Sequence, residues 1–179
     1  MSIFMMGVSY KTAPVEIRES LTVPEYRLKE TLGYLREKHQ FTEAVVLSTC
    51  NRMEVYTRSE HPAQSSLTSL SKFFNEFYSG ANLDNALYQK ESYEAIQHLF
   101  RVASGLDSMV IGETDVLGQV KSAYLFAQNN GATGKITNVL FQRAIFVGKA
   151  IRTKTNISEG ASSVGSVAVQ LAEKIFGRL

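Results

Sequence analysis

The first 91 residues alternate between short apolar runs and stretches in which apolar residues recur every three or four positions. Short apolar runs are typical of strands, whereas the wider spacing is typical of one helix face. The short runs predict four strands, at residues 3–8, 44–47, 54–58 and 86–90. The wider spacing predicts two helices, one carrying Leu28, Leu32 and Leu35 and one at residues 65–78.

This order of elements is that of the ferredoxin-like, or split β-α-β, arrangement. We therefore expect an α+β fold in which an antiparallel sheet carries two helices on one face. Thr22 and Glu25 form an S/T-x-x-E capping pattern with Pro24 in the first turn. This pattern predicts that the first helix begins there, capped by the Thr22 side chain.

The second half of the chain shows helical spacing throughout and predicts a helical extension of the fold. Its apolar residues form four groups: Tyr93, Ile96, Leu99, Phe100 and Ala103; Leu117, Val120, Tyr124 and Ala127; Ile136, Val139, Leu140 and Val147; Val164, Val167, Leu171 and Ile175. We expect one domain at 1–157, with a ferredoxin-like part at 1–91 and a helical part at 92–157, followed by a connecting helix at 158–179. The last helix has no later segment to pack against, so we expect a fragment of a longer protein.

Composition narrows the class of protein. Apolar residues make up 44% of the 179 residues and charged residues 20%, which favours a folded globular chain over a disordered one. A single cysteine cannot form an internal disulfide. The N-terminus lacks the pattern of a signal peptide, and no run approaches the roughly 18 apolar residues of a membrane span. We expect a cytoplasmic protein with no membrane contact.

Charge is distributed unevenly along the chain. Residues 116–158 contain no Asp or Glu but six basic residues, although the whole chain carries a net charge of only +2. The basic residues of this stretch are Lys121, Lys135, Arg143, Lys149, Arg152 and Lys154. Such segregation fits a surface that binds a polyanion, and it equally fits a solvated helix face whose acidic partners lie elsewhere in the fold.

Patterns for nucleotide and metal sites are missing from the sequence. No G-x-G-x-x-G occurs, and the stretch from Gly131 to Lys135 departs from a phosphate loop at both ends, with Asn129 in place of Gly and Ile136 in place of Ser or Thr. The histidines and the cysteine show no metal-ligand spacing. We therefore expect no cofactor-binding residues in this chain and no metal.

The lone cysteine lies in a polar turn between two predicted strands. Cys50 is flanked by Thr49 and Asn51, and Arg52 follows two residues after it. A thiol displayed at a strand end beside a guanidinium is a candidate nucleophile. A lone cysteine is more often a small buried apolar residue, so the spacing alone leaves both interpretations open.

Four segments are similar, in order, to the motifs of glutamyl-tRNA reductases. They are Gly7-Val-Ser-Tyr-Lys-Thr-Ala-Pro-Val-Glu16, Leu47-Ser-Thr-Cys-Asn-Arg-Met-Glu-Val-Tyr56, His98-Leu-Phe-Arg-Val-Ala-Ser-Gly-Leu-Asp-Ser-Met-Val-Ile-Gly-Glu113 running on to Lys121, and Gly148-Lys-Ala-Ile-Arg-Thr153. Together they span nearly the whole chain. The resemblance implies the N-terminal catalytic domain of such a reductase, with the NADPH-binding domain and a helical dimerisation domain beyond residue 179.

The resemblance also implies a chemistry. The family reduces glutamyl-tRNA with NADPH to glutamate-1-semialdehyde, on the route through 5-aminolevulinate to tetrapyrroles, by way of a thioester on its cysteine. Because this chain contains no cofactor site of its own, we expect it to form and hydrolyse the thioester only. Its implied partners are glutamyl-tRNA and the aminomutase that acts next. The full-length protein is expected to be a homodimer and this chain a monomer.

The resemblance assigns site residues by position. Cys50 and His98 are the implied catalytic residues. The implied substrate-binding residues are Thr49, Asn51, Arg52, Ser108, Glu113, Thr114, Asp115 and Gln119. Arg52 is expected to raise the ionised fraction of the Cys50 thiol or to pair with a substrate carboxylate. For tRNA we expect contacts at Lys149, Arg152 and Lys154.

Three positions depart from the family pattern, and two other functions compete with it. Tyr10 stands where the family usually has His, Met53 where it commonly has Thr, and Asp115 where it commonly has Gln. We expect the first two to lie outside the substrate contacts, and Asp115 also suits the N-cap of a helix. The competing functions are a tRNA-binding or regulatory module of the same fold, and a different cysteine-thioester enzyme such as a hydrolase.

Overall fold

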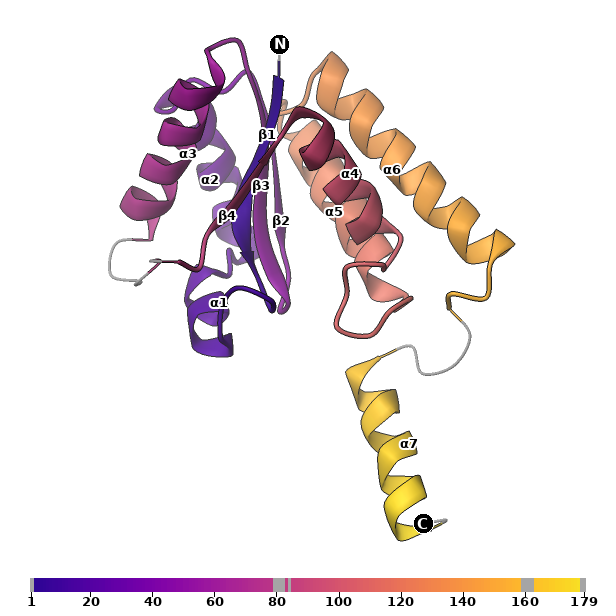
Figure 1. Cartoon of the computed structure of the whole chain (residues 1–179). Coiled ribbons are helices and arrows are strands. Elements are labelled where there is room, and N and C mark those ends of the chain that lie inside the picture. The colour runs from indigo at the N-terminus through magenta and orange to yellow at the C-terminus, as the bar shows by residue number, and fades with distance from the viewer. Residues whose placement is uncertain (1, 79–82, 84, 159–162, 178–179) are drawn as a thin grey trace.

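A four-stranded antiparallel sheet lies at the centre of the molecule, with helices on both of its faces (Figure 1). The computed structural model describes residues 2–78, 83, 85–158 and 163–177. The strands are β1 (Ser2–Ser9), β2 (Glu43–Ser48), β3 (Arg52–Ser59) and β4 (Tyr88–Glu91), in the order β2-β3-β1-β4. This is the strand order of a ferredoxin-like sheet, so the α+β prediction is confirmed.

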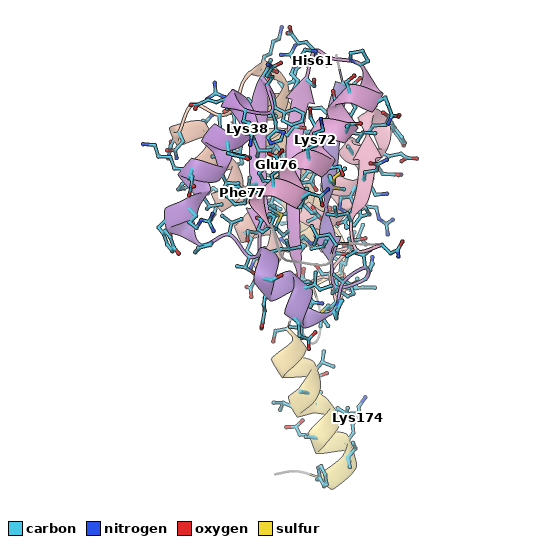
Figure 2. The ribbon with its side chains drawn as sticks, turned by 90° about the vertical axis from the view of Figure 1, so that its left-hand side faces the viewer. Lys38, His61, Lys72, Glu76, Phe77 and Lys174 are labelled. Carbon is cyan, nitrogen blue, oxygen red and sulfur yellow. The ribbon has the colours of Figure 1, made fainter. Side chains whose placement is uncertain are left out.

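One face of the sheet carries α2 (Glu25–Glu37) and α3 (Ala63–Phe77), as the two-helix prediction required. The two helices are joined at the surface by an ion pair of 2.9 Å between Lys38 and Glu76, and Arg27 stacks on the ring of Phe77. Figure 2 looks directly onto this face.

The opposite face carries the helical extension. Helices α4 (Ser92–Ala103) and α5 (Asp115–Asn129) pack on the sheet, and α6 (Lys135–Lys154) packs on both of them (Figure 1). Because helices cover both faces, almost every residue of β1 and β3 is buried. Helix α7 (Val164–Phe176) points away from this body and exposes Val167, Leu171 and Ile175.

Three sequence predictions about helices are wrong in detail. A short helix, α1 (Val15–Leu21), was not expected; Thr22 ends it and bonds back to Arg18, so Thr22 does not cap α2. The N-cap of α5 is Thr114, and Asp115 is its first residue. Helix α6 turns a different face to the core than predicted, with Phe141 buried and Val139 exposed.

A buried carboxylate from the sheet caps α6. The Glu43 side chain accepts hydrogen bonds from the backbone N–H groups of Gly134 (3.1 Å), Ile136 (3.4 Å) and Thr137 (2.7 Å) and from the Thr137 hydroxyl (2.6 Å). Burial raises the pKa of Glu43, but these bonds outweigh it, and its pKa lies below the ordinary value.

We expect Glu43→Gln to lower the free energy of unfolding by about 1–3 kcal/mol at pH 7, because an amide cannot accept all four bonds. A carboxylate whose pKa is lowered by folding stabilises the fold at pH values above its unfolded-state pKa. This contribution is lost as the pH falls through its folded-state pKa. The deficit of the variant should therefore shrink below about pH 4. Urea denaturation across pH checks this, with exposed Glu37→Gln as the matched control; an equal deficit at every pH would contradict it.

Candidate active site

The turn between β2 and β3 displays the cysteine. The Thr49 hydroxyl accepts hydrogen bonds from the N–H groups of Asn51 (3.2 Å) and Arg52 (3.1 Å), and this fixes the backbone around Cys50. The Cys50 carbonyl accepts a bond from Arg18 Nε at 3.2 Å. The Cys50 thiol itself is free and exposed. The structure therefore places it where a substrate can reach it, and its role as nucleophile stays a prediction.

Directly behind the turn lies a buried polar network centred on Glu54. Side chains alternate along a strand, so Arg52, Glu54 and Tyr56 of β3 share the sheet face that α4 and α6 cover. The Glu54 carboxylate is fully buried and accepts bonds from Arg52 Nη1 and from the Tyr56 hydroxyl, both at 2.6 Å. Tyr88 of β4 donates to the same carboxylate, and His98 Nε2 of α4 lies 2.9 Å from it. Four side chains from three elements thus converge on one anion.

Electrostatics keep this network charged. Burial raises the pKa of Glu54, but the Arg52 charge and the His98 hydrogen bond outweigh it, so the net pKa lies well below its ordinary value. For Arg52, burial lowers the pKa and the Glu54 charge raises it, with a net rise. Burial and the Glu54 charge together raise the pKa of Tyr88, which stays a neutral donor. Arg52 and Glu54 therefore form an ion pair shielded from water.

The Arg52 guanidinium is buried, whereas the Cys50 thiol is exposed. Arg52 is 2% exposed, and its Nη2 donates to the main-chain oxygen of Asp107 and lies 3.3 Å from the Asp107 carboxylate. Asp107 is also held by Lys11 at 2.7 Å. Burial raises the pKa of Asp107, but the Lys11 bond and the Arg52 charge outweigh it and lower the pKa. A substrate carboxylate would reach Arg52 only by displacing one of these partners.

His98 borders solvent-filled space. One cavity of about 270 Å³ and a neighbouring one of about 190 Å³ are both lined by His98, Lys90 and Asp107. His98 is 6% exposed, and its Nε2 faces Glu54. The structure thus gives His98 a fixed ring orientation at the edge of a cavity, which suits a proton-transfer role and also suits a satisfied core histidine.

A larger cavity of about 700 Å³ lies between α2 and α5 at the β2 edge of the sheet. It brings together three of the substrate-binding residues expected from sequence, Thr114, Asp115 and Gln119, with Ser48 just before the turn. Its charged lining residues are the carboxylates of Glu25 and Asp115. A pocket lined by acids and without a basic side chain does not fit the phosphates of a dinucleotide cofactor.

The remaining expected substrate residues lie elsewhere. Ser108 is buried, and among the described residues its hydroxyl has no hydrogen-bond partner. Tyr10 bonds through its hydroxyl to the Ser108 carbonyl (3.1 Å) and through its N–H to the Asn51 carbonyl (2.9 Å). Tyr10 therefore links the cysteine turn to the loop before α5, and the expectation that it lies outside the substrate contacts stays a prediction. Met53 is 1% exposed and belongs to the core.

The expected tRNA contacts divide into two kinds. Lys149 and Lys154 are exposed near the end of α6. Arg152 is only partly exposed, and its Nη2 donates to the Glu113 carbonyl at 2.6 Å. The Arg152 guanidinium thus already holds the protein's own backbone, and its assignment to tRNA stays a prediction.

Sequence reasoning missed Glu54, Tyr88, Asp107 and Lys11. The alternation of charged and aromatic residues along β3 was the one available signal, because residues two apart in a strand share a face. Tyr88 contacts Glu54 across 34 positions, Asp107 contacts Arg52 across 55, and Lys11 contacts Asp107 across 96, so no local pattern marks these partners.

Three comparisons place the chain among known proteins. Residues 6–155 match the family model described as glutamyl-tRNAGlu reductase, N-terminal domain. The chain belongs to this family. Similar relatives are the glutamyl-tRNA reductases of Akkermansia muciniphila, 45% identical over 179 residues, and of Shouchella clausii, 47% identical over 174 residues. They align with 100% and 96% of this chain.

The fold comparison agrees with the sequences. The solved glutamyl-tRNA reductase from Methanopyrus kandleri matches 99% of the chain with a TM-score of 0.76 and 36% sequence identity. The chain covers 53% and 38% of the two bacterial relatives and 41% of the archaeal one, so it spans about half of their length or less.

The described residues also bear on two other kinds of feature, membrane-spanning helices and metal-binding groups. In the described parts of the chain, no helix is both long and apolar enough to cross a membrane. Among the same residues, no group of three or more His, Cys, Asp or Glu is placed to hold a metal ion.

Proposed function

We propose that this chain is the glutamyl-tRNA-accepting part of a glutamyl-tRNA reductase, and that Cys50 is its nucleophile. The observation that carries the proposal is the exposed thiol on a turn fixed by Thr49, which is followed along the chain by the buried Arg52–Glu54 pair. The Cys50 thiolate attacks the glutamyl ester carbonyl, the bond to the ribose oxygen breaks, and that oxygen takes a proton as tRNA leaves. Glutamate then remains on Cys50 as a thioester.

The reduction itself is proposed for the longer protein. NADPH would supply hydride to the thioester there, giving glutamate-1-semialdehyde and the free thiolate. The residues of this chain do not fit the cofactor, because the sequence contains no phosphate-cradling glycine loop and the 700 Å³ cavity is acidic. In this chain alone, water accepts the glutamyl group from Cys50, and the thioester is hydrolysed slowly to glutamate.

The test is transfer of label. After incubation with glutamyl-tRNA labelled in the glutamyl group, we expect one label per chain on Cys50 and slow release of glutamate, both unaffected by NADPH. Cys50→Ser should show neither, because a serine hydroxyl is a far weaker nucleophile at neutral pH. Binding of tRNA without transfer of label would instead favour a tRNA-binding module, and turnover of simple thioesters without preference for tRNA would favour a hydrolase.

We propose that the end of α6 contacts the tRNA backbone through Lys149 and Lys154. Changing both to Gln should weaken glutamyl-tRNA binding and lower the slope of log K against log salt by about 0.7–0.9 for each phosphate that is no longer neutralised. A filter-binding salt titration measures this. The matched control is Lys29→Gln with Lys72→Gln, which removes the same charge from α2 and α3 on the opposite face (Figure 2 labels Lys72). Equal slopes in both double variants would assign the α6 lysines to a solvated surface.

A further inference from the structure

The end of α6 and the residues after it hold the loop between α4 and α5, residues 104–114. Arg152 donates to the Glu113 carbonyl at 2.6 Å. Gly112 lies with a positive φ of 83° directly against the backbone of Ile157, and a Cβ at Gly112 would overlap the Ile157 carbonyl. The Gly112 N–H bonds to the Gly105 carbonyl at 3.0 Å and closes the loop on itself.

Both ends of the same loop also rest on α6. A Cβ added at Gly148 would lie 2.6 Å from the Ala103 carbonyl oxygen, at the end of α4, and 3.0 Å from a methyl group of Leu117, in the first turn of α5. At Gly148, helix α6 therefore lies against the backbone of α4 and against a side chain of α5, on either side of the loop. The loop is clamped at its start, at Gly112 and at Glu113.

The surroundings of Arg152 do not suit a phosphate contact. Its Nε is buried and has no hydrogen-bond partner among the described residues. Burial lowers the pKa of Arg152, while the negative charges of Glu113 and Asp115 act on it in the opposite direction. These two carboxylates would repel a phosphate that approached the same guanidinium. The hydrogen bond to Glu113 is thus the contact that the side chain is placed to make.

We propose that Arg152 is a positioning residue for the reaction, acting through the backbone of the 104–114 loop. The bond to the Glu113 carbonyl fixes the peptide that precedes Thr114, and Thr114 and Asp115 line the 700 Å³ cavity. Arg152 thereby sets where the glutamyl group is held relative to Cys50. The inference rests on the proposed function, since it assumes that this loop contacts the glutamyl group.

The experiment compares Arg152→Met, Arg152→Lys and Arg143→Met, the last being an exposed arginine of the same helix that loses the same charge. Amide hydrogen exchange across residues 104–114 should be on the order of tenfold faster in Arg152→Met, and kcat/KM for a small glutamyl thioester, per titrated Cys50, should fall by on the order of tenfold. Arg152→Lys should recover most of both, because an ammonium can still donate to the carbonyl. Arg143→Met should match wild type in both.

Three outcomes overturn the inference. Wild-type exchange and wild-type thioester kinetics in Arg152→Met would show that Arg152 positions nothing. If Arg152→Met lowers the slope of log K for tRNA binding against log salt and leaves the thioester kinetics unchanged, Arg152 is a phosphate contact. A lower melting temperature with unchanged kcat/KM per titrated thiol would make it merely structural. Failure of the proposed function is distinct, because it appears in the wild-type protein as the absence of label on Cys50.

Discussion

Arg52→Lys is expected to lower kcat/KM for thioester formation by on the order of 10²-fold or more, although the charge is preserved. The guanidinium spans two anchors at once, Glu54 through Nη1 and Asp107 through Nη2. A single ammonium cannot bond to both while remaining buried behind the turn. The loop that carries Asp107 and the strand next to Cys50 would then lose this direct bridge and be linked through Tyr10 alone among the described contacts.

Single-turnover labelling of Cys50 from glutamyl-tRNA measures this effect. The matched control is Arg58→Lys, on the same strand, whose guanidinium pairs with the exposed Glu60 at 3.1 Å. We expect that variant to keep wild-type rates. Full activity in purified Arg52→Lys would show that the two-sided anchoring is irrelevant to the reaction.

Glu54→Ala is expected to lower the free energy of unfolding by about 3–5 kcal/mol, because it leaves the Arg52 charge buried without its closest carboxylate. It also removes the acceptor used by Tyr56, Tyr88 and His98. The pKa of Glu54 is depressed, so its contribution is present above the unfolded-state pKa and is lost only as the pH falls through the folded value. The deficit should therefore be constant between about pH 8 and 5.

Urea denaturation monitored by circular dichroism measures the deficit. Glu60→Ala, which removes the exposed partner of Arg58, should cost at most about 1 kcal/mol. The double variant Arg52→Met with Glu54→Leu should regain the part of the deficit that comes from the unpaired Arg52 charge, since well-packed apolar residues can replace a buried pair. The part that comes from Tyr56, Tyr88 and His98 losing their acceptor should remain. A small deficit in Glu54→Ala would mean that water reaches Arg52.

The sequence predicted the elements that have a strong local signal. The β-α-β-β-α-β order follows from periodicity, and each strand was placed within two residues of its observed ends. Helix α1 was missed because seven residues are too few to show a period. The buried face of α6 was misjudged because Ile136 and Val139 are apolar yet exposed to solvent. The packing of Phe141 against Tyr56 and Tyr124 depends on residues far away in the sequence, so no local pattern reveals it.

The parts of the site that lie within one short segment were predictable from the sequence. The parts formed by contacts between distant segments were not. The turn holding Cys50 was expected from two adjacent apolar runs, and the thiol is exposed there. Arg52 was expected to face the substrate, because nothing local reveals that Glu54 and Asp107 take up its guanidinium. The position of Arg152 likewise depends on Glu113, 39 residues earlier, so its charge suggested a phosphate contact.

The Glu43 cap has a consequence for dividing the chain. Residues 92–157 form a helical part by sequence, yet α6 begins on a carboxylate from β2. Helices α4 and α5 bury their apolar faces on β1 and β2. A peptide that begins at residue 92 would therefore lack the carboxylate that caps α6. It would also lack the sheet on which α4 and α5 pack. We therefore expect the two parts to unfold as one cooperative unit, and a boundary for dissection or for grafting should be placed after α6.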